Sequence, residues 1–241
     1  MYKLPILEII KHTFSIFEKN KFSILRALII PYLMMTALIY IEPYLVAKVT
    51  TLITFIIGFV FALLEHFIAS LFIISCHRLI LLGSSSIPKY GLIIPKKREI
   101  RFWGWTVALY ILIMIFIAFF GILSSFALIM LIPPFILPLL GYILGTYLFA
   151  RYILIFPAVA LDHRPTLDWA WKQTNGNGFR ILILLAMTAL PIYFMRYFMS
   201  FESSILLNGF IIYINFILGV IGIIFISLYY NELCIQDYVK D

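Results

Sequence analysis

The chain has 241 residues, of which 64% are hydrophobic and only 12% are charged, and its net charge is +7. A soluble domain of this length carries about 25% charged residues and buries about 70–75% of its surface, so it could not hide this much apolar surface in one core. The composition therefore excludes an ordinary soluble domain and predicts one membrane domain, residues 1–241, solvated mostly by lipid.

The basic residues predict an orientation rather than a nucleic-acid partner. Lys and Arg are retained on the cytoplasmic side of multi-pass membrane proteins. All of them except Lys48 and Arg196 fall on one side of the topology described below. We therefore expect a multi-pass protein of the bacterial inner (plasma) membrane with both termini in the cytoplasm and no nucleic-acid partner.

Residues 1–22 are expected to form an interfacial helix. Pro5 suits a first helical turn, and Glu8 and Glu18 argue against a cleavable signal peptide. The apolar face comprises Ile6, Ile9, Ile10, Thr13, Phe14 and Phe17. Charged and polar residues occupy the other face, as in amphipathic helices that lie on a membrane, and a turn is predicted at Asn20.

Six apolar segments follow, each about long enough to cross a bilayer. They are residues 23–41, 49–75, 103–130, 135–160, 179–199 and 205–230. The fold class is therefore an all-α polytopic membrane protein with six transmembrane helices and cytoplasmic amphipathic interfacial helices. Tight turns face outward and the longer polar connections face inward.

Ionisable residues inside the spans are rare and costly, so they mark either structure or function. Glu65 and His66 lie near the middle of the second span, and Arg151 lies on the fourth at a similar depth. We expect Glu65 to pair with Arg151, with Tyr147 joining them. Such a pair would hold two helices in register or line a substrate or proton pathway, and both alternatives stay open.

The connections on the inner side resemble one another, because each leads into an apolar span. Residues 83–101 are looser than the first connection and lead to Trp103 and Trp105, which are expected as interfacial anchors. Three units, each an interfacial segment followed by a membrane hairpin, are therefore predicted.

Residues 162–178 form the third connection and are expected to contain a short interfacial helix. Thr166 is a suitable N-cap, and Asp168 and Lys172 are spaced for an ion pair. Gly176 can take the left-handed conformation that closes a helix. Two more interfacial anchors, Trp169 and Trp171, are expected at headgroup depth.

The turn after this helix is a candidate headgroup site. It leads into the N-terminus of the fifth span, where free N–H groups favour anions. The candidate residues are Lys172, Asn175, Gly176, Gly178 and Arg180. The alternative is a flexible turn beside ordinary positive-inside residues.

Small and amide residues mark helix packing. Asn208, Asn215, Gly219 and Gly222 form one stripe on the sixth span, and Gly141 and Gly145 form a small-residue motif on the fourth. Such residues let helices approach and hydrogen-bond, either within the bundle or at a dimer face.

The sequence contains no nucleophile elbow, P-loop or paired catalytic carboxylates. It also has no metal-ligand spacing, so no catalytic residue, metal or cofactor is expected. These observations favour a non-enzymatic protein.

Two segments resemble a known family. The first, ARYILIFPAVALDHRPTLDWAWKQTNGNGFRILILL, spans residues 150–185, and the second, SLYYNELCIQDY, spans residues 227–238. Over residues 150–184 and 227–238 the chain is similar to bacterial membrane proteins related to the membrane domain of glycerophosphodiester phosphodiesterases. The family's Tyr-x-Asp-Leu tail is replaced here by a version with Glu232. The resemblance implies a six-helix membrane domain, and the family's hydrolase activity belongs to a separate barrel for which this chain has no room.

The expected function is a membrane scaffold or a component that engages lipids and partners. The expected partners are membrane lipids and other membrane or cytoplasmic proteins. The alternative is a transporter or channel for a small solute or protons, with Glu65, His66 and Arg151 lining the path.

Overall fold

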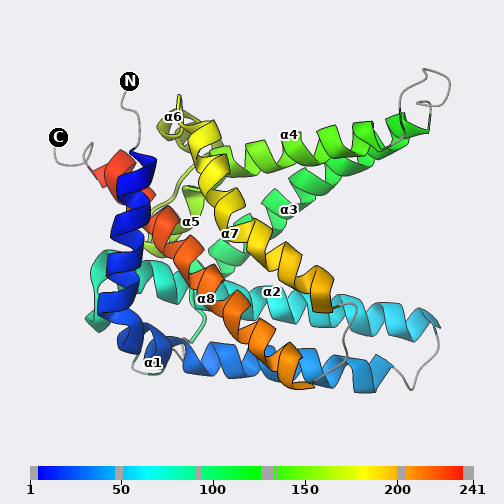
Figure 1. Cartoon of the computed structure of the whole chain (residues 1–241), viewed down its shortest axis with the longest axis horizontal. Coiled ribbons are helices and arrows are strands. Elements are labelled where there is room, and N and C mark those ends of the chain that lie inside the picture. The colour runs from blue at the N-terminus through cyan, green and yellow to red at the C-terminus, as the bar shows by residue number, and fades with distance from the viewer. Residues whose placement is uncertain are drawn as a thin grey trace.

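The structure is a computed structural model that describes residues 5–46, 51–88, 90, 94–125, 133, 135–199 and 205–235. Every regular element in these residues is helical (Figure 1), so the all-α class is confirmed for this part of the chain. The elements are α1 (Ile6–Val46), α2 (Thr51–Leu82), η1 (Ser84–Ser86), α3 (Lys97–Ser124), α4 (Ile136–Tyr152), α5 (Ile155–Ala160), α6 (Leu167–Gln173), α7 (Gly178–Met199), α8 (Ile205–Tyr230) and the short π-helix η2 (Asn231–Ile235).

Four helical segments in the described residues are long and apolar enough to cross a membrane. They are Leu52–Leu82, Lys97–Ser124, Ile136–Ala160 and Tyr213–Cys234. A fifth is present if the two parts of α1, Ile6–Arg26 and Ile29–Leu38, count as one broken span. The apolar part of α7 found in the described residues, Gly178–Pro191, is shorter than a span needs. The described part of the chain is thus helical with four or five candidate spans, and six spans stay a prediction.

The predicted turn at Asn20 is wrong. α1 runs through this residue, and the Asn20 side-chain amide donates to the carbonyl oxygen of Ile16 at 3.0 Å, inside the same helix. A short polar side chain can bond back to the preceding turn instead of ending the helix. The change of direction comes later, where Ile6–Arg26 and Ile29–Leu38 meet at 67°. A first segment therefore lies at an angle to the apolar one, as predicted, but the bend falls between Arg26 and Ile29 instead of at Asn20.

The fourth predicted span is one candidate span, Ile136–Ala160, with an interruption of two residues between α4 and α5. Pro157 has no N–H to donate, and its ring would clash with the carbonyl group of Ile153, four residues earlier. The helix accordingly stops at Tyr152, and the amide of Phe156 bonds to the Ile153 oxygen at 3.2 Å in a tighter turn. α5 then resumes and is buried along its whole length.

The helices pack as three hairpins, α1 with α2, α3 with α4, and α7 with α8, as the sequence predicts. They converge at one end, where α1 begins and α8 ends, and diverge at the other (Figure 1). We call these the basic end and the splayed end. The core lies at the basic end, around Leu154, Val159 and Ile224. There the His77 ring nitrogen Nδ1 lies 2.8 Å from the Ser227 hydroxyl, which joins α2 to α8.

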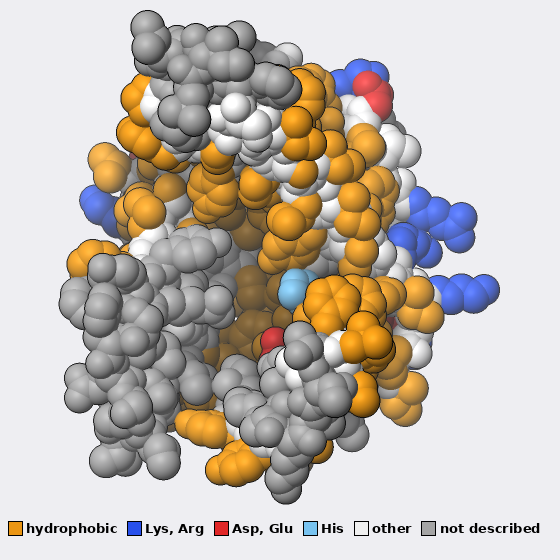
Figure 2. All heavy atoms as spheres, turned by 90° about the vertical axis from the view of Figure 1, so that its right-hand side faces the viewer, with side chains coloured by type: hydrophobic (Ala, Val, Ile, Leu, Met, Phe, Trp, Pro, Cys, Tyr) orange, Lys and Arg blue, Asp and Glu red, His pale blue; other side chains and the backbone are white. Residues whose placement is uncertain are grey.

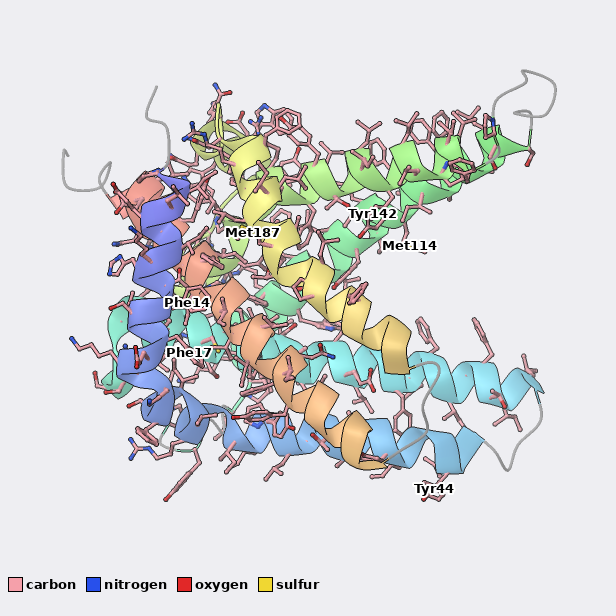
Figure 3. All side chains as sticks on the ribbon, viewed as in Figure 1. Phe14, Phe17, Tyr44, Met114, Tyr142 and Met187 are labelled. Carbon is pink, nitrogen blue, oxygen red and sulfur yellow. The ribbon has the colours of Figure 1, made fainter. Side chains whose placement is uncertain are left out.

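Apolar side chains also cover the outside of the molecule. Seen from the splayed end, hydrophobic groups dominate the described surface, which is hollowed between the diverging helices (Figure 2). Tyr44, Met114 and Tyr142 stand out from three different helices (Figure 3), and all are exposed. Exposed apolar surface on this scale is costly in water and is expected of helices that face lipid.

Candidate functional site

Arg151 does not pair with Glu65, so that prediction is wrong. Its Nε donates to the Thr174 hydroxyl at 2.9 Å, and its Nη2 donates to the carbonyl oxygen of Trp171 at 2.6 Å. Its guanidinium lies over the Trp171 ring, 3.8 Å from the centroid. Tyr147 does join, since its hydroxyl accepts from Nη1 at 3.3 Å. Because α4 ends at Tyr152, Arg151 sits at the basic end beside α6.

Gly178 completes this cluster at the start of α7. A Cβ atom there would lie 2.6 Å from the Arg151 Cδ atom and 3.1 Å from the Tyr147 hydroxyl. Thr174 is fully buried, and its hydroxyl lies 2.8 Å from the carbonyl oxygen of Ala170. The cluster of Tyr147, Arg151, Thr174 and Gly178 therefore fixes α4, α6 and α7 together and leaves the guanidinium no open side.

The predicted headgroup site is only partly exposed. The Lys172–Asp168 ion pair is confirmed, with Nζ and Oδ2 2.6 Å apart and both side chains in solvent. Gly176 has φ 73°, which confirms its left-handed conformation, and Asn175 is exposed. Gly178 packs on Arg151, and Arg180 is half-buried. Anion binding at this site stays a prediction.

The predicted N-cap of α6 is confirmed as well, because the Thr166 hydroxyl accepts from the Trp169 amide at 3.1 Å.

The other polar residues predicted within the membrane lie in separate places. His66 is exposed, its Nδ1 lies 2.8 Å from the Ala62 carbonyl oxygen, and its ring lies 5.3 Å from that of Tyr110. Glu65, next to it on α2, is half-buried. Asn215 lines a cavity against α1 and α2. The structure therefore does not bring Glu65, His66 and Arg151 to one site.

The four tryptophans contact other side chains near the basic end. Trp103 lies 6.2 Å from Phe67 between ring centroids, and Trp169 lies 6.4 Å from Tyr230. Trp171 is held by Arg151, and Trp105 packs on the core. Their role as anchors at the lipid interface stays a prediction.

Asn208 belongs to the packing stripe predicted on the sixth span. Its side chain lies outside the described residues.

An ion network at the basic end was not predicted from the sequence. Asp162 follows α5 and accepts from Arg98 Nη1 at 2.9 Å and from Arg78 Nη1 at 3.4 Å. The same Arg78 atom donates to the carbonyl oxygen of Ala160 at 2.8 Å, so it also caps α5. These contacts join α2, α3 and α5 across long sequence separations. Counting basic residues for orientation could not reveal them, because that count treats each cation as solvated.

Glu99 fixes the start of α3 beside this network. It is fully buried, its Oε2 accepts from the Lys96 amide at 2.9 Å, and its Oε1 accepts from Arg98 Nε at 2.9 Å. A carboxylate at the third helical position that accepts from the N-cap amide is half of a capping box. Arg98 is therefore held between two carboxylates, Glu99 and Asp162.

A recess of about 500 Å³ opens beside the network. Among the described residues, three cations, two hydroxyls and three apolar side chains surround it. The lining residues are Arg78, Ser85, Ser86, Ile87, Pro88, Ile94, Lys96 and Arg98. We call this the basic recess. Neither carboxylate of the network lines it, and no ion pair engages the Lys96 ammonium within the residues that the structure covers.

The basic recess combines features that suit an anionic amphiphile. Arginine and lysine bind phosphate oxygens through charge-assisted hydrogen bonds. The apolar residues beside them, of which Ile94 is 78% exposed, offer contact to acyl chains. A search of the described residues finds no group of His, Cys, Asp or Glu that could hold a metal ion. The arrangement can bind an anion, and it presents no nucleophile with an adjacent base.

Comparison with known proteins adds no relative to this picture. No family model, no curated protein and no solved structure matches the chain. The resemblance to the membrane domain of glycerophosphodiester phosphodiesterases therefore stays a prediction, and the chain is described by its own geometry.

Proposed function

We propose that this chain is a non-enzymatic, multi-pass inner-membrane protein that binds anionic phospholipid headgroups at its basic end. The basic recess is the single observation that carries the proposal. It brings three cations together in one concavity. The positive-inside rule by itself does not require basic residues to share a site.

The charges around the recess favour an anion. Arg78 and Arg98 pair with the carboxylates of Asp162 and Glu99, whereas the Lys96 ammonium has no ion pair among the described residues, so one positive charge of the recess is uncompensated. The carboxylates also hold the two guanidinium groups in place, which lowers the entropy that ordering them on a ligand would cost. Basic residues near a membrane gain about 1 kcal/mol each from anionic lipid.

The topology that accompanies this proposal has six spans. The part of α1 that follows its bend belongs to the first, α4 and α5 together form the fourth, and α7 is the fifth. The basic end would face the cytoplasm, with both termini there. In the first part of α1, Ile9 and Thr13 are buried while Glu8 and Lys11 are exposed, which supports an amphipathic segment on the inner leaflet.

A pair of lysine variants tests the lipid site. The full chain is purified in mild detergent and titrated with short-chain phosphatidylglycerol, and binding is followed by native mass spectrometry. Lys96→Ala should weaken binding about fivefold, the equivalent of about 1 kcal/mol. The matched control is Lys172→Ala, which removes an exposed lysine outside the recess and should leave the affinity unchanged.

Three results would contradict the proposal. Equal binding of short-chain phosphatidylcholine would show that charge is not recognised. An unchanged affinity in Lys96→Ala would remove the recess from the site. A loss in Lys172→Ala alone would move the site to the start of α7.

The alternative of a transporter lacks a comparable observation. Arg151 is engaged by α6, so a pathway would have to be built from Glu65 and His66 without it. Flux of a solute or protons through liposomes containing the protein, abolished in Glu65→Gln, would favour transport over lipid binding.

A further inference from the structure

We propose that a cavity between α1, α2 and α8 binds a long-chain lipid alcohol, whose hydroxyl group bonds to the Asn215 amide. The cavity has a volume of about 340 Å³. It lies where α8 crosses the first hairpin (Figure 1). It is separate from the basic recess, so the proposal does not depend on that site.

The size and lining of the cavity suit an apolar ligand. Ligand pockets span about 300–1,000 Å³ and are mostly apolar with a few polar groups. Three aromatic rings from three helices form much of the wall. Phe216 lies 4.8 Å from Tyr32 and 5.1 Å from Phe72 between ring centroids. None of the described residues that line the cavity is charged, so a carboxylate or a phosphate would be uncompensated there.

Asn215 supplies the polar contact. Its Oδ1 is buried without a hydrogen-bond partner in the described structure. An unsatisfied amide in the low-dielectric interior of a membrane protein is costly, and a hydroxyl group both donates and accepts. A hydroxyl therefore satisfies the amide in either orientation, whereas a hydrocarbon tail leaves it unsatisfied.

Gly219 keeps the cavity open one helical turn along α8. A Cβ atom at this position would meet no other atom within 4 Å, so the glycine is not needed for close helix contact. Gly222 differs, because its Cβ atom would lie 3.3 Å from the Thr188 hydroxyl of α7. A larger side chain at Gly219 should thus enter the cavity without displacing a helix.

The test uses photoreactive probes on the full chain in lipid nanodiscs. A diazirine-bearing hexadecanol is compared with the matching hexadecane and hexadecanoic acid, and crosslinked peptides are identified by mass spectrometry. Hexadecanol should label peptides of α1, α2 and α8 at least fivefold more than the alkane. Asn215→Leu, which keeps the volume, should lower alcohol labelling about fivefold and leave alkane labelling unchanged.

Gly219→Leu is the second variant and should abolish labelling of the cavity by all probes. Gly219→Ala should retain most of it, and Lys96→Ala, outside the cavity, should retain all of it. Equal labelling by alcohol and alkane would overturn the proposal, since it would show only a lipid tail filling space. Preferential labelling by the acid, or unchanged alcohol labelling in Asn215→Leu, would also overturn it.

Discussion

Asp162 combines an unfavourable backbone conformation with side-chain contacts to two other helices. It has φ 68°, a left-handed conformation that is unfavourable for most side chains. Aspartate is among the few non-glycine residues that adopt it, because its short polar side chain can bond locally. Here the carboxylate accepts from Arg78 and Arg98 instead, so the turn after α5 is stabilised by two other helices.

Substitution at Asp162 should separate these two effects. Asp162→Ala keeps the backbone strain and loses both arginine contacts, whereas Asp162→Gly loses the contacts and relieves the strain. Both variants should unfold at lower temperature than the parent. The glycine variant should be the more stable of the two by about 1 kcal/mol. Thermal unfolding in detergent measures the order, and an alanine variant as stable as the glycine variant would contradict it.

At the scale of the element, glycine decides how closely α3 and α4 approach. Gly141 and Gly145 both face α3, so this small-residue motif packs within the bundle. Of the two predicted alternatives, packing within the bundle and packing at a dimer face, the first is observed. A Cβ atom at Gly141 would lie 2.8 Å from Phe120 Cβ and 3.0 Å from the carbonyl oxygen of Phe116. Backbone cannot move aside as a flexible side chain can, so this position tolerates little.

Alanine substitutions should therefore rank by the space available. Gly141→Ala should destabilise the protein by about 1–3 kcal/mol, the cost of overpacking a close contact. Gly145→Ala, with Ile113 Cγ2 at 3.3 Å, should cost less than Gly141→Ala. The control is Gly121→Ala, where nothing lies within 4 Å. Unfolding with sodium dodecyl sulfate measures the three, and equal losses would argue against close packing at Gly141.

At the scale of the whole molecule, the two ends have different characters. The basic end holds the core, the ion network and the Arg151 cluster, while the helices separate toward the splayed end (Figure 1). Among the described residues, the Arg151 cluster, the ion network and the His77–Ser227 contact all join helices in the first region. The described part of the bundle is thus held together by polar contacts at its basic end and exposes apolar helix surface beyond it.

The orientation of the two ends can be tested with single cysteines. Both native cysteines, Cys76 and Cys234, are buried thiols outside any disulfide of the described residues, so an introduced exposed thiol should react selectively. Tyr44→Cys lies toward the splayed end, in the outward turn expected between the spans at residues 23–41 and 49–75, so it should react with an impermeant maleimide in intact spheroplasts. Lys172→Cys, at the basic end, should react only in inside-out vesicles. The reverse pattern would invert the proposed topology.

Parts of the local structure were predictable because they depend on neighbours in the chain. The Thr166 N-cap, the Asp168–Lys172 pair, the left-handed Gly176 and the contact of Tyr147 with Arg151 all involve short sequence separations. The turn at Asn20 failed, because a polar residue can bond back within its own helix. Local preferences thus predicted caps and turns better than the position of the bend.

The sequence by itself determined that the chain is helical and too apolar for water, since these properties follow from composition and from the lengths of apolar segments. Only the tertiary structure decided the partners of its charges. Arg151 bonds α6 rather than Glu65, and Arg78 and Arg98 meet at Asp162 to border a recess. The physical reason is that a hydrogen bond acts over about 3 Å. Which side chains come that close depends on where Pro157 breaks a helix and how the hairpins pack, not on spacing along the chain.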